Sequence, residues 1–252
     1  MRIDLNSDLG ESFGPWPMGQ DAALMTSISS ANVACGFHAG DPGTMRATVE
    51  LAREKGVAIG AHPGFPDLVG FGRREMKATP GEVEDFVLYQ VAALAGIAAA
   101  QGMTLQHVKA HGALYNMACR DRALADAIAR AVASFDRTLI LFGLPNSELL
   151  RAGEAAGLPV AAEVFADRAY DPDGSLTSRS KPGSVIHDTQ QVVDRAIRMV
   201  KDKQVIAVDG STIALQADTI CLHGDTPGAA DHARAVRAGL EAAGIRITNL
   251  RS

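Results

Sequence analysis

The chain has 252 residues, 47% of them hydrophobic, and a formal net charge of −5 at pH 7. This length and composition suit one large α/β domain that can bury a sizeable core. Lysine and arginine do not cluster, so we expect neither nucleic acid nor an anionic membrane as a partner. The three cysteines form no C-x-x-C pair, and no basic segment precedes an apolar stretch at the N-terminus. We therefore expect no signal peptide and a reducing, cytoplasmic location.

A helix that ends in glycine, followed at once by a short apolar strand, recurs along the chain. Glycine is favoured past a helix end because it adopts the left-handed conformation cheaply. The glycines in this position are Gly56, Gly102, Gly157 and Gly244. Helix starts are marked by a capping residue before a proline at the first helical position. They are Asp41-Pro42, Thr79-Pro80 with Glu82 at capping-box spacing, and Thr226-Pro227.

Strands and helices alternate throughout, which predicts a parallel sheet. The expected strands are 2–7, 31–35, 57–61, 105–110, 138–142, 160–166 and 219–223, with 205–208 and 245–250 as weaker candidates. Almost every strand runs into a polar or ionisable residue. Such residues collect at the carboxyl ends of the strands of a β/α barrel, whereas an open sheet concentrates them at its switch point. The pattern therefore favours a closed barrel, and no linker divides it, so we expect one domain over residues 1–252.

Two segments differ from this rhythm. The stretch 86–106 carries no formal charge, but it is rich in alanine and interrupted by Gln90 and Gln101. It predicts a buried helix rather than a membrane span. Residues 167–188 contain two prolines, two glycines and many small polar residues. A loop this long usually has a task in a compact domain, such as covering a site, although an ordinary surface excursion is the alternative.

The stretch 105–116, L-Q-H-V-K-A-H-G-A-L-Y-N, is the most informative for chemistry. Because side chains alternate along a strand, His107, Lys109 and His111 point to one face. Two imidazoles and an ammonium are poor core material, since each would have to lose water. They suit the top of a barrel strand, where side chains meet a substrate. A polar edge strand with solvated histidines is the alternative.

Other strand exits carry similar groups. They are Asp4, Asn6, Asp8 and Glu11 in or just after the first strand, Asn32, Cys35, His38 and Asp41 in or just after the second, His62, Arg73 and Arg74 after the third, and Glu163, Asp167, His223 and Asp225 later in the chain. Asp41 is most simply a helix cap. The paired arginines could clamp a carboxylate with a bidentate fork, or lie in a solvated loop.

The histidines at strand exits, with carboxylates nearby, allow two chemistries. One is general acid–base work on an amide, with Lys109 or a backbone donor stabilising the oxyanion. The other is a metal ion that two or three histidines and an aspartate hold and that activates water. No H-x-x-x-H helix motif marks a zinc site, so a metal is possible but not indicated. A Cys35–His38 nucleophile pair is a third option, although a small cysteine at a strand end usually packs.

The sequence contains no G-x-S-x-G elbow and no G-x-x-x-x-G-K-[ST] phosphate loop. A serine nucleophile of the hydrolase type is therefore not expected. Any nucleotide would need another mode of binding or another chain.

Six motifs are spread in order over nearly the whole chain. They are D-L-N-S-D-L-G-E (4–11), A-N-V-A-C-G-F-H-A-G-D (31–41), G-A-H-P-G-F-P-D with G-F-G-R-R (60–74), V-K-A-H-G-A-L-Y-N (108–116), E-V-F-A-D-R-A-Y (163–170) and C-L-H-G-D-T (221–226). Together they resemble the family of the 5-oxoprolinase A subunit, also called LamB/YcsF. One departure is Ala110, where the family pattern has proline; it leaves the chemistry intact and makes the local backbone less rigid.

The resemblance implies a seven-stranded parallel β/α barrel related to polysaccharide deacetylases. It also implies ATP-dependent opening of 5-oxo-L-proline (pyroglutamate) to L-glutamate, shared with partner subunits B and C. ATP is expected for the complex as a whole. The missing phosphate loop favours the partners as its binding site. A homo-oligomer is left open.

On this basis we expect Asp8 or Glu11 to serve as the base and Lys109 to neutralise developing negative charge. The histidines expected to position or shuttle protons are His38, His62, His111 and His223. Substrate-binding residues are expected to be Asn6, Asn32, Arg73, Glu163 and Asp225, with Arg73 on the substrate carboxylate.

Two other functions compete with this hypothesis. The barrel kinship and the histidines also fit a stand-alone, metal-dependent amide or polysaccharide deacetylase. A non-catalytic subunit that only binds the lactam is the second rival. The many ionisable groups at strand ends argue against mere binding, because one small acid needs few of them.

Overall fold

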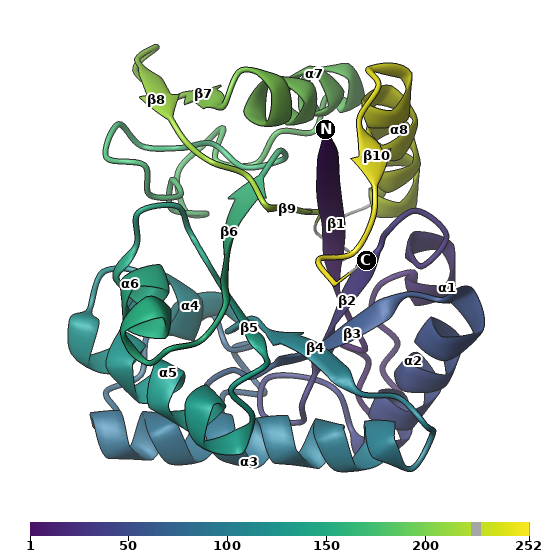
Figure 1. Cartoon of the computed structure of the whole chain (residues 1–252), viewed down its shortest axis with the longest axis vertical. Coiled ribbons are helices and arrows are strands. Elements are labelled where there is room, and N and C mark those ends of the chain that lie inside the picture. Colours follow the sequence, from purple (N-terminus) through teal and green to yellow (C-terminus); the bar gives the residue numbers. More distant parts are fainter. Residues whose placement is uncertain (223–227, 252) are drawn as a thin grey trace.

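The structure is a computed structural model that describes residues 1–222 and 228–251. Seven strands form a closed ring (Figure 1), in the order β1 (Arg2–Leu9), β2 (Ser30–Ala34), β3 (Ala58–His62), β4 (Leu105–Val108), β5 (Ile140–Gly143), β6 (Val160–Phe165) and β9 (Thr219–Cys221). Every neighbouring pair is parallel, and β9 closes the ring by pairing with both β6 and β1. The predicted seven-stranded parallel barrel is confirmed.

The helices lie around the outside of this ring (Figure 1). In the described part of the chain they are α1 (Asp21–Leu24), α2 (Pro42–Lys55), α3 (Pro80–Ala99), α4 (Gly112–Ala118), α5 (Arg122–Phe135), α6 (Glu148–Ala155), α7 (Thr189–Lys201) and α8 (Ala229–Ala242). The four predicted helix-ending glycines all have positive φ, between 67° and 79°. The side chain of Asp41 caps α2, and Thr79 and Glu82 form the predicted capping box of α3. The start predicted at Thr226-Pro227 lies outside the described residues.

The two weaker strand candidates, 205–208 and 245–250, are not members of the closed ring. β7 (Gln204–Ile206) pairs antiparallel with β8 (Thr212–Ala214) in a separate hairpin. β10 (Arg246–Ile247) adds only to the first two residues of β1. Both segments therefore extend the fold without contributing to the barrel wall.

The uncharged stretch 86–106 was predicted as a buried helix, with a helix end at Gly102 and a strand from residue 105; the helix is present, but it is only partly buried. α3 ends at Ala99, and β4 begins at Leu105. The helix buries one face only, and Tyr89 on its other face is 62% exposed. A run without charge does not mark an element, because turns and strand starts can be uncharged too. Within the described residues, no helix is both long and apolar enough to cross a bilayer.

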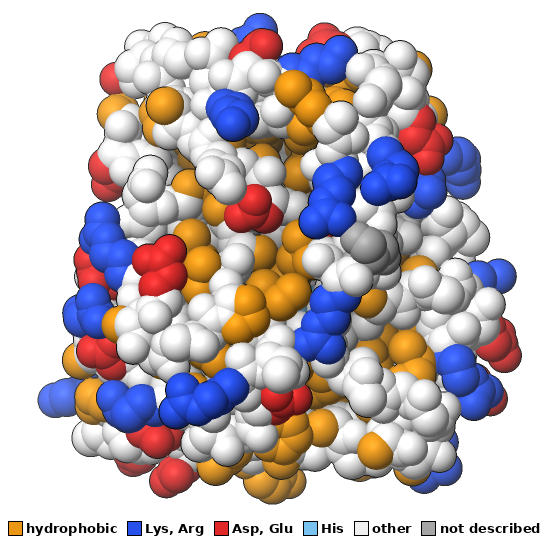
Figure 2. Space-filling model, in the orientation of Figure 1, with side chains coloured by type: hydrophobic (Ala, Val, Ile, Leu, Met, Phe, Trp, Pro, Cys, Tyr) orange, Lys and Arg blue, Asp and Glu red, His pale blue; other side chains and the backbone are white. Residues whose placement is uncertain are grey.

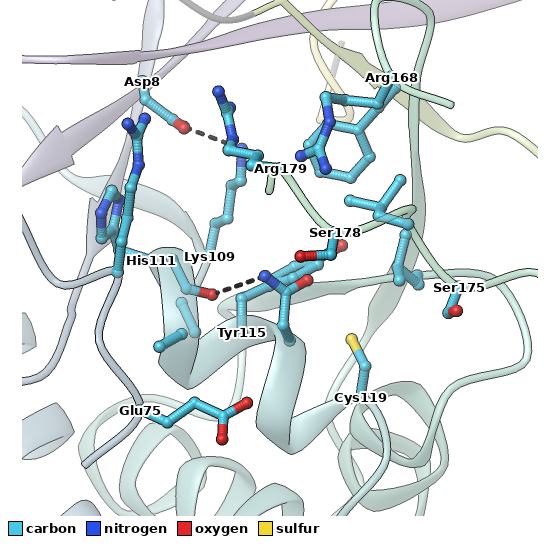
Figure 3. A pocket seen from close by; sticks show the side chains of 18 of the residues that line it. Asp8, Glu75, Lys109, His111, Tyr115, Cys119, Arg168, Ser175, Ser178 and Arg179 are labelled. Atoms are coloured by element: carbon cyan, nitrogen blue, oxygen red, sulfur yellow. Dashed lines mark hydrogen bonds and ion pairs between the residues drawn. The ribbon is translucent and has the colours of Figure 1, made fainter. Parts of the chain in front are cut away.

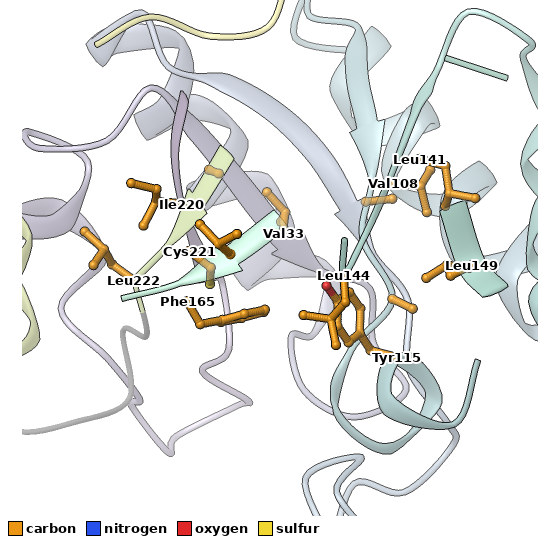
Figure 4. Packing of buried hydrophobic residues seen from close by; sticks show 14 of the residues in the cluster. Val33, Val108, Tyr115, Leu141, Leu144, Leu149, Phe165, Ile220, Cys221 and Leu222 are labelled. Atoms are coloured by element: carbon orange, nitrogen blue, oxygen red, sulfur yellow. The ribbon is translucent and has the colours of Figure 1, made fainter. Parts of the chain in front are cut away.

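The barrel strands separate two kinds of buried side chain. In β1 the apolar Ile3, Leu5 and Leu9 belong to the hydrophobic cluster, while the alternating Asp4 and Asn6 are buried polar residues. Figure 4 shows the same cluster around Val108, Leu141 and Leu149. Each fully buried aliphatic side chain contributes about 1.5–3 kcal/mol by leaving water. The apolar layer thus holds the barrel together and leaves its interior to polar groups.

The face in Figure 2 shows side chains filling the centre of the ring of strands. Positive and negative side chains are interspersed around it, without one sign dominating this face. This mixed distribution of charge agrees with the lysines and arginines being scattered along the sequence.

Candidate active site

A chain of hydrogen bonds runs through the barrel interior, and we call its members the interior network: Asp4, Asn6, Asn32, His107 and Thr219. Thr219 Oγ1 donates to Asp4 Oδ2 at 2.5 Å, and Asn6 Nδ2 donates to Thr219 Oγ1 at 2.7 Å. Asn32 Nδ2 donates to Asn6 Oδ1 at 2.7 Å, and its own Oδ1 lies 2.6 Å from His107 Nε2. All five side chains are at most 1% exposed. Burial raises the pKa of Asp4 to about 6 despite hydrogen bonds from Thr219 and two serines.

His107 is a packed core histidine. Its ring stacks on Phe142, with centroids 4.2 Å apart and planes 8° from parallel. Burial, and then the charge of Lys109, lower the pKa of His107 to about 3, so the ring is neutral. Gly60 makes room for it, because a Cβ at that position would lie 2.2 Å from the ring. The ring therefore buttresses Asn32 rather than meeting a ligand.

Two carboxylates flank the ammonium of Lys109, and we call Asp8, Lys109 and Glu163 the lysine triad. Lys109 Nζ lies 2.8 Å from Asp8 Oδ1 and 3.0 Å from Glu163 Oε1. Burial would lower the pKa of Lys109, but the carboxylates outweigh it and the pKa rises well above its ordinary value. Lys109 is thus a fixed cation that can stabilise negative charge, and not a base.

Four residues from the exits of β1 to β4 form the histidine cluster: Glu11, His38, His62 and His111. His111 Nδ1 lies 2.9 Å from His62 Nε2, and the rings of His38 and His111 stack at 3.7 Å. Glu11 Oε1 is 3.8 Å from both His38 Nε2 and His111 Nδ1. Burial, and then neighbouring histidines, lower the pKa of His38 and of His111 well below the ordinary value.

The donor atoms of the histidine cluster fit a metal ion. One ligand atom from each of the four residues lies within 4.8 Å of the other three, and all four side chains are buried. Neither ring nitrogen of His38 has a hydrogen-bond partner among the described residues. Three imidazoles and one carboxylate are a donor set typical of zinc and neighbouring transition ions.

A cavity of about 410 Å³ opens above the lysine triad and the histidine cluster. Asp8, Lys109 and His111 lie on one side of it, and Arg168, Ser175 and Ser178 approach from the other (Figure 3). The second group comes from residues 167–188, which form no helix and contribute only isolated bridges. The long loop therefore does line the cavity, as expected for a segment that covers a site.

Arg168 is the buried cation of this cavity. Only 5% of the residue is exposed, and its guanidinium donates to the carbonyl oxygens of Ser184 and Thr177. Burial, and then the charge of Arg179, lower the pKa of Arg168 to about 10. Both acceptors are neutral, while the charge of Asp167 acts in the opposite direction and raises this pKa. A guanidinium that lines a cavity can bind an anion with two parallel hydrogen bonds, so this position suits an anionic ligand.

The sequence matches the family model described as LamB/YcsF over residues 3–252. The chain belongs to the LamB/YcsF family. Among similar proteins, the A subunit of 5-oxoprolinase from Rhodopseudomonas palustris (strain ATCC BAA-98 / CGA009) is 56% identical over 248 residues, covering 98% of each chain. The protein of the same description from Tolumonas auensis is 57% identical over 246 residues, again covering 98% of each chain.

Solved structures resemble this LamB/YcsF protein at two levels. A lactam utilization protein from Thermus thermophilus superposes with a TM-score of 0.94 at 51% identity, covering 98% of this chain and 99% of the other. The peptidoglycan deacetylase PdaC from Bacillus subtilis has a TM-score of 0.50 at 13% identity, covering 99% and 88%. The second likeness concerns the fold alone.

The fold brings most of the predicted site residues of the LamB/YcsF chain together. Asp8, Glu11, His62, Lys109, His111 and Arg73 line the cavity. Asn6, Asn32, His38 and Glu163 are completely buried beside or beneath these residues. Two predicted site residues, His223 and Asp225, lie outside the described residues. The roles assigned to all of these residues stay predictions.

Arg74 and Cys35 follow the alternatives that the sequence offered for them, and two further cavity residues were missed. Arg74 is 66% exposed at its side chain and pairs with Asp67 instead of clamping a ligand. Cys35 is 2% exposed, and burial raises the pKa of its thiol to about 12, which disfavours the Cys35–His38 nucleophile pair. The cavity-lining Tyr115 and Arg168 were missed as site residues. Both stand inside family motifs, which was the one available signal.

Proposed function

We propose that this LamB/YcsF protein is a single-domain, cytoplasmic A subunit of 5-oxoprolinase, which works with ATP and with subunits B and C. The reaction would open the lactam of 5-oxo-L-proline to L-glutamate. The observation that carries the proposal is the lysine triad at the floor of the cavity, beside three buried imidazoles. The names of its relatives agree with a hydrolase acting on a cyclic amide.

A lactam is a poor electrophile because its nitrogen lone pair is delocalised into the carbonyl group. Phosphorylation of the lactam oxygen by ATP would make the ring carbon reactive. We assign that step to the partner subunits, since the sequence has no phosphate loop. The present chain would then receive the activated lactam and carry out its hydrolysis.

The hydrolysis would begin at Asp8, which lines the cavity and is 12% exposed at its side chain. Water attacks the ring carbon and gives its proton to Asp8, while Lys109 stabilises the negative charge that develops. The C–N bond breaks when the ring nitrogen takes a proton, and a second water then releases the phosphate. A divalent ion in the histidine cluster would add Lewis-acid polarisation of a substrate oxygen or of water.

Arginines at the other side of the cavity would hold the anionic ends of the substrate. Arg168 is buried and oriented by two carbonyl oxygens, whereas Arg73 and Arg179 line the same cavity at exposed positions. Guanidinium groups bind carboxylates and phosphates with two parallel hydrogen bonds. This division places charge recognition on loops and bond breaking at the strand ends.

Glutamate release from 5-oxo-L-proline tests the proposal. The purified chain would be assayed with subunits B and C, with and without ATP, and with each component omitted in turn. We expect glutamate only when every component is present. ATP-independent amide or sugar deacetylation by the chain alone would favour the deacetylase instead. Unchanged glutamate release with Lys109→Met would favour a non-catalytic binding subunit.

A further inference from the structure

Two imidazoles of the histidine cluster face each other with their donor and acceptor roles in conflict. His62 Nδ1 lies 2.8 Å from the carbonyl oxygen of Lys109, and His111 Nε2 lies 2.8 Å from that of Phe71. A carbonyl oxygen only accepts, so each of these outer nitrogens must carry a hydrogen. A neutral imidazole has one N–H, and the inner nitrogens, His62 Nε2 and His111 Nδ1, are therefore both lone-pair acceptors.

These inner nitrogens lie only 2.9 Å apart. Two lone pairs at that distance repel each other unless a positive species lies between or beside them. A single shared proton would satisfy this pair of nitrogens. A metal ion would satisfy the same pair and could bind further donors as well.

His38 distinguishes these two solutions. It is 0% exposed, and both of its ring nitrogens lack a hydrogen-bond partner within the described residues. A buried polar group without a partner is costly, and a proton held between two other rings does not change that. His38 stacks on His111, and its Nε2 faces Glu11 Oε1 at 3.8 Å. A cation at this point would give His38 and Glu11 a common partner.

We propose that the histidine cluster binds one divalent transition-metal ion, for which Zn²⁺ has the best-matched donor set. Ligands at about 2.0–2.1 Å in a tetrahedron stand about 3.3 Å from one another. The donor separations run from 2.9 Å to at most 4.8 Å, so small side-chain rotations would bring all four into place. The outer N–H groups of His62 and His111 already donate to carbonyl oxygens, which is the usual support of a metal-binding imidazole.

Metal binding by the isolated chain tests this site without any assay of turnover. The full-length protein would be treated with a chelator, dialysed, and titrated calorimetrically with Zn²⁺ and Co²⁺. Bound metal would be counted by elemental analysis, and Co²⁺ would be followed by its visible absorption. We expect one equivalent per chain, a tetrahedral Co²⁺ spectrum, and a melting temperature that rises when the metal is added.

Two variants separate this cluster from adventitious binding. His38→Gln should weaken Zn²⁺ binding about 100-fold, whereas His187→Gln, at an exposed histidine outside the cavity, should bind as the unaltered chain does. If His38→Gln does not fold, Glu11→Gln replaces it with the same expectation. Absence of a stoichiometric ion, or equal binding by the cluster variants, overturns the proposal and leaves the shared proton. Because no partner or lactam is used, this result is independent of the glutamate assay.

Discussion

The barrel holds two groups of buried polar side chains that differ in how they are satisfied. In the interior network, consecutive hydrogen bonds between Asp4, Thr219, Asn6, Asn32 and His107 are 2.5 to 2.7 Å long. The lysine triad and the histidine cluster lie beside the cavity, and His38 keeps two ring nitrogens without partners among the described residues. Both groups contain an aspartate and at least one histidine, and nearly all of their members are buried.

This difference in hydrogen bonding shows that burial and residue type alone do not identify a side chain that binds a ligand or takes part in catalysis. A polar group whose partners are complete stabilises one arrangement of the barrel. A polar group that is buried, incompletely satisfied and next to a cavity is available for a ligand. Substitution should separate the two groups, because variants of the first should lose stability and variants of the second should lose turnover.

Replacing Lys109 should have the largest effect. Lys109→Met leaves Asp8 and Glu163 without their shared cation, so we expect unfolding free energy to fall by about 3–5 kcal/mol. Turnover should fall by about 10²- to 10³-fold through loss of charge stabilisation. Urea unfolding and glutamate release with the partners would measure the two effects. Full turnover in a folded Lys109→Met protein would contradict the role of the triad.

The raised pKa of Asp4 should make stability depend on pH. Its folded-state pKa is about 6, against an ordinary value of 3.8. The protonated carboxyl therefore stabilises the folded state fully below pH 3.8, and this stabilisation is lost as pH rises through 6. At about 1.4 kcal/mol per pKa unit, the loss in unfolding free energy is about 3 kcal/mol. Urea unfolding of the unaltered chain and of Asp4→Asn between about pH 4 and pH 8 measures this.

The stability difference between the unaltered chain and Asp4→Asn should shrink by about that amount over this range of pH. The exposed Asp202→Asn serves as the control, for which the difference should stay constant. A constant difference for Asp4→Asn would mean that Asp4 titrates normally.

His107 in β4 and His111 just before α4 offer the sharpest comparison. His111→Gln should lower turnover about 100-fold, because His111 lines the cavity. His107→Gln should cost about 1–3 kcal/mol of stability, because its bond to Asn32 is buried, and leave turnover of the folded protein nearly unchanged. Parallel unfolding and glutamate assays test both. A reversed pattern would show that the interior network takes part in the reaction.

Arg168 should give the smallest of these effects. Arg168→Gln removes charge-assisted hydrogen bonds to the substrate worth about 1.5–3 kcal/mol, which corresponds to a rise in KM of about 10- to 100-fold. Arg74→Gln is the matched control, because Arg74 is exposed and pairs with Asp67. Steady-state kinetics against 5-oxo-L-proline would show equal KM values in both variants if Arg168 does not meet the substrate.

Local signals in the sequence determined the elements and their order. Glycine at Gly56 and Gly102, the capping box at Thr79, and the period-two alternation of β1 depend on neighbouring residues only, so they can be read without the fold. The resemblance to the family, carried by the six motifs, predicted that seven strands close into a barrel. The hairpin of β7 and β8 was missed: residues 205–208 were only a weaker strand candidate and β8 was not predicted, because strands of three residues carry too little pattern.

Only the tertiary structure decided which polar residues share the cavity. Alternation predicts that His107 and His111 share a face, but it does not give their depth along the barrel axis. That depth decides that His107 packs in the core and that His111 lines the cavity. The geometry of the histidine cluster is equally hidden, because its four residues come from the exits of four strands and form no local motif. Closure of β9 against β1, from opposite ends of the chain, creates the interior in which these groups lose water and so acquire their chemistry.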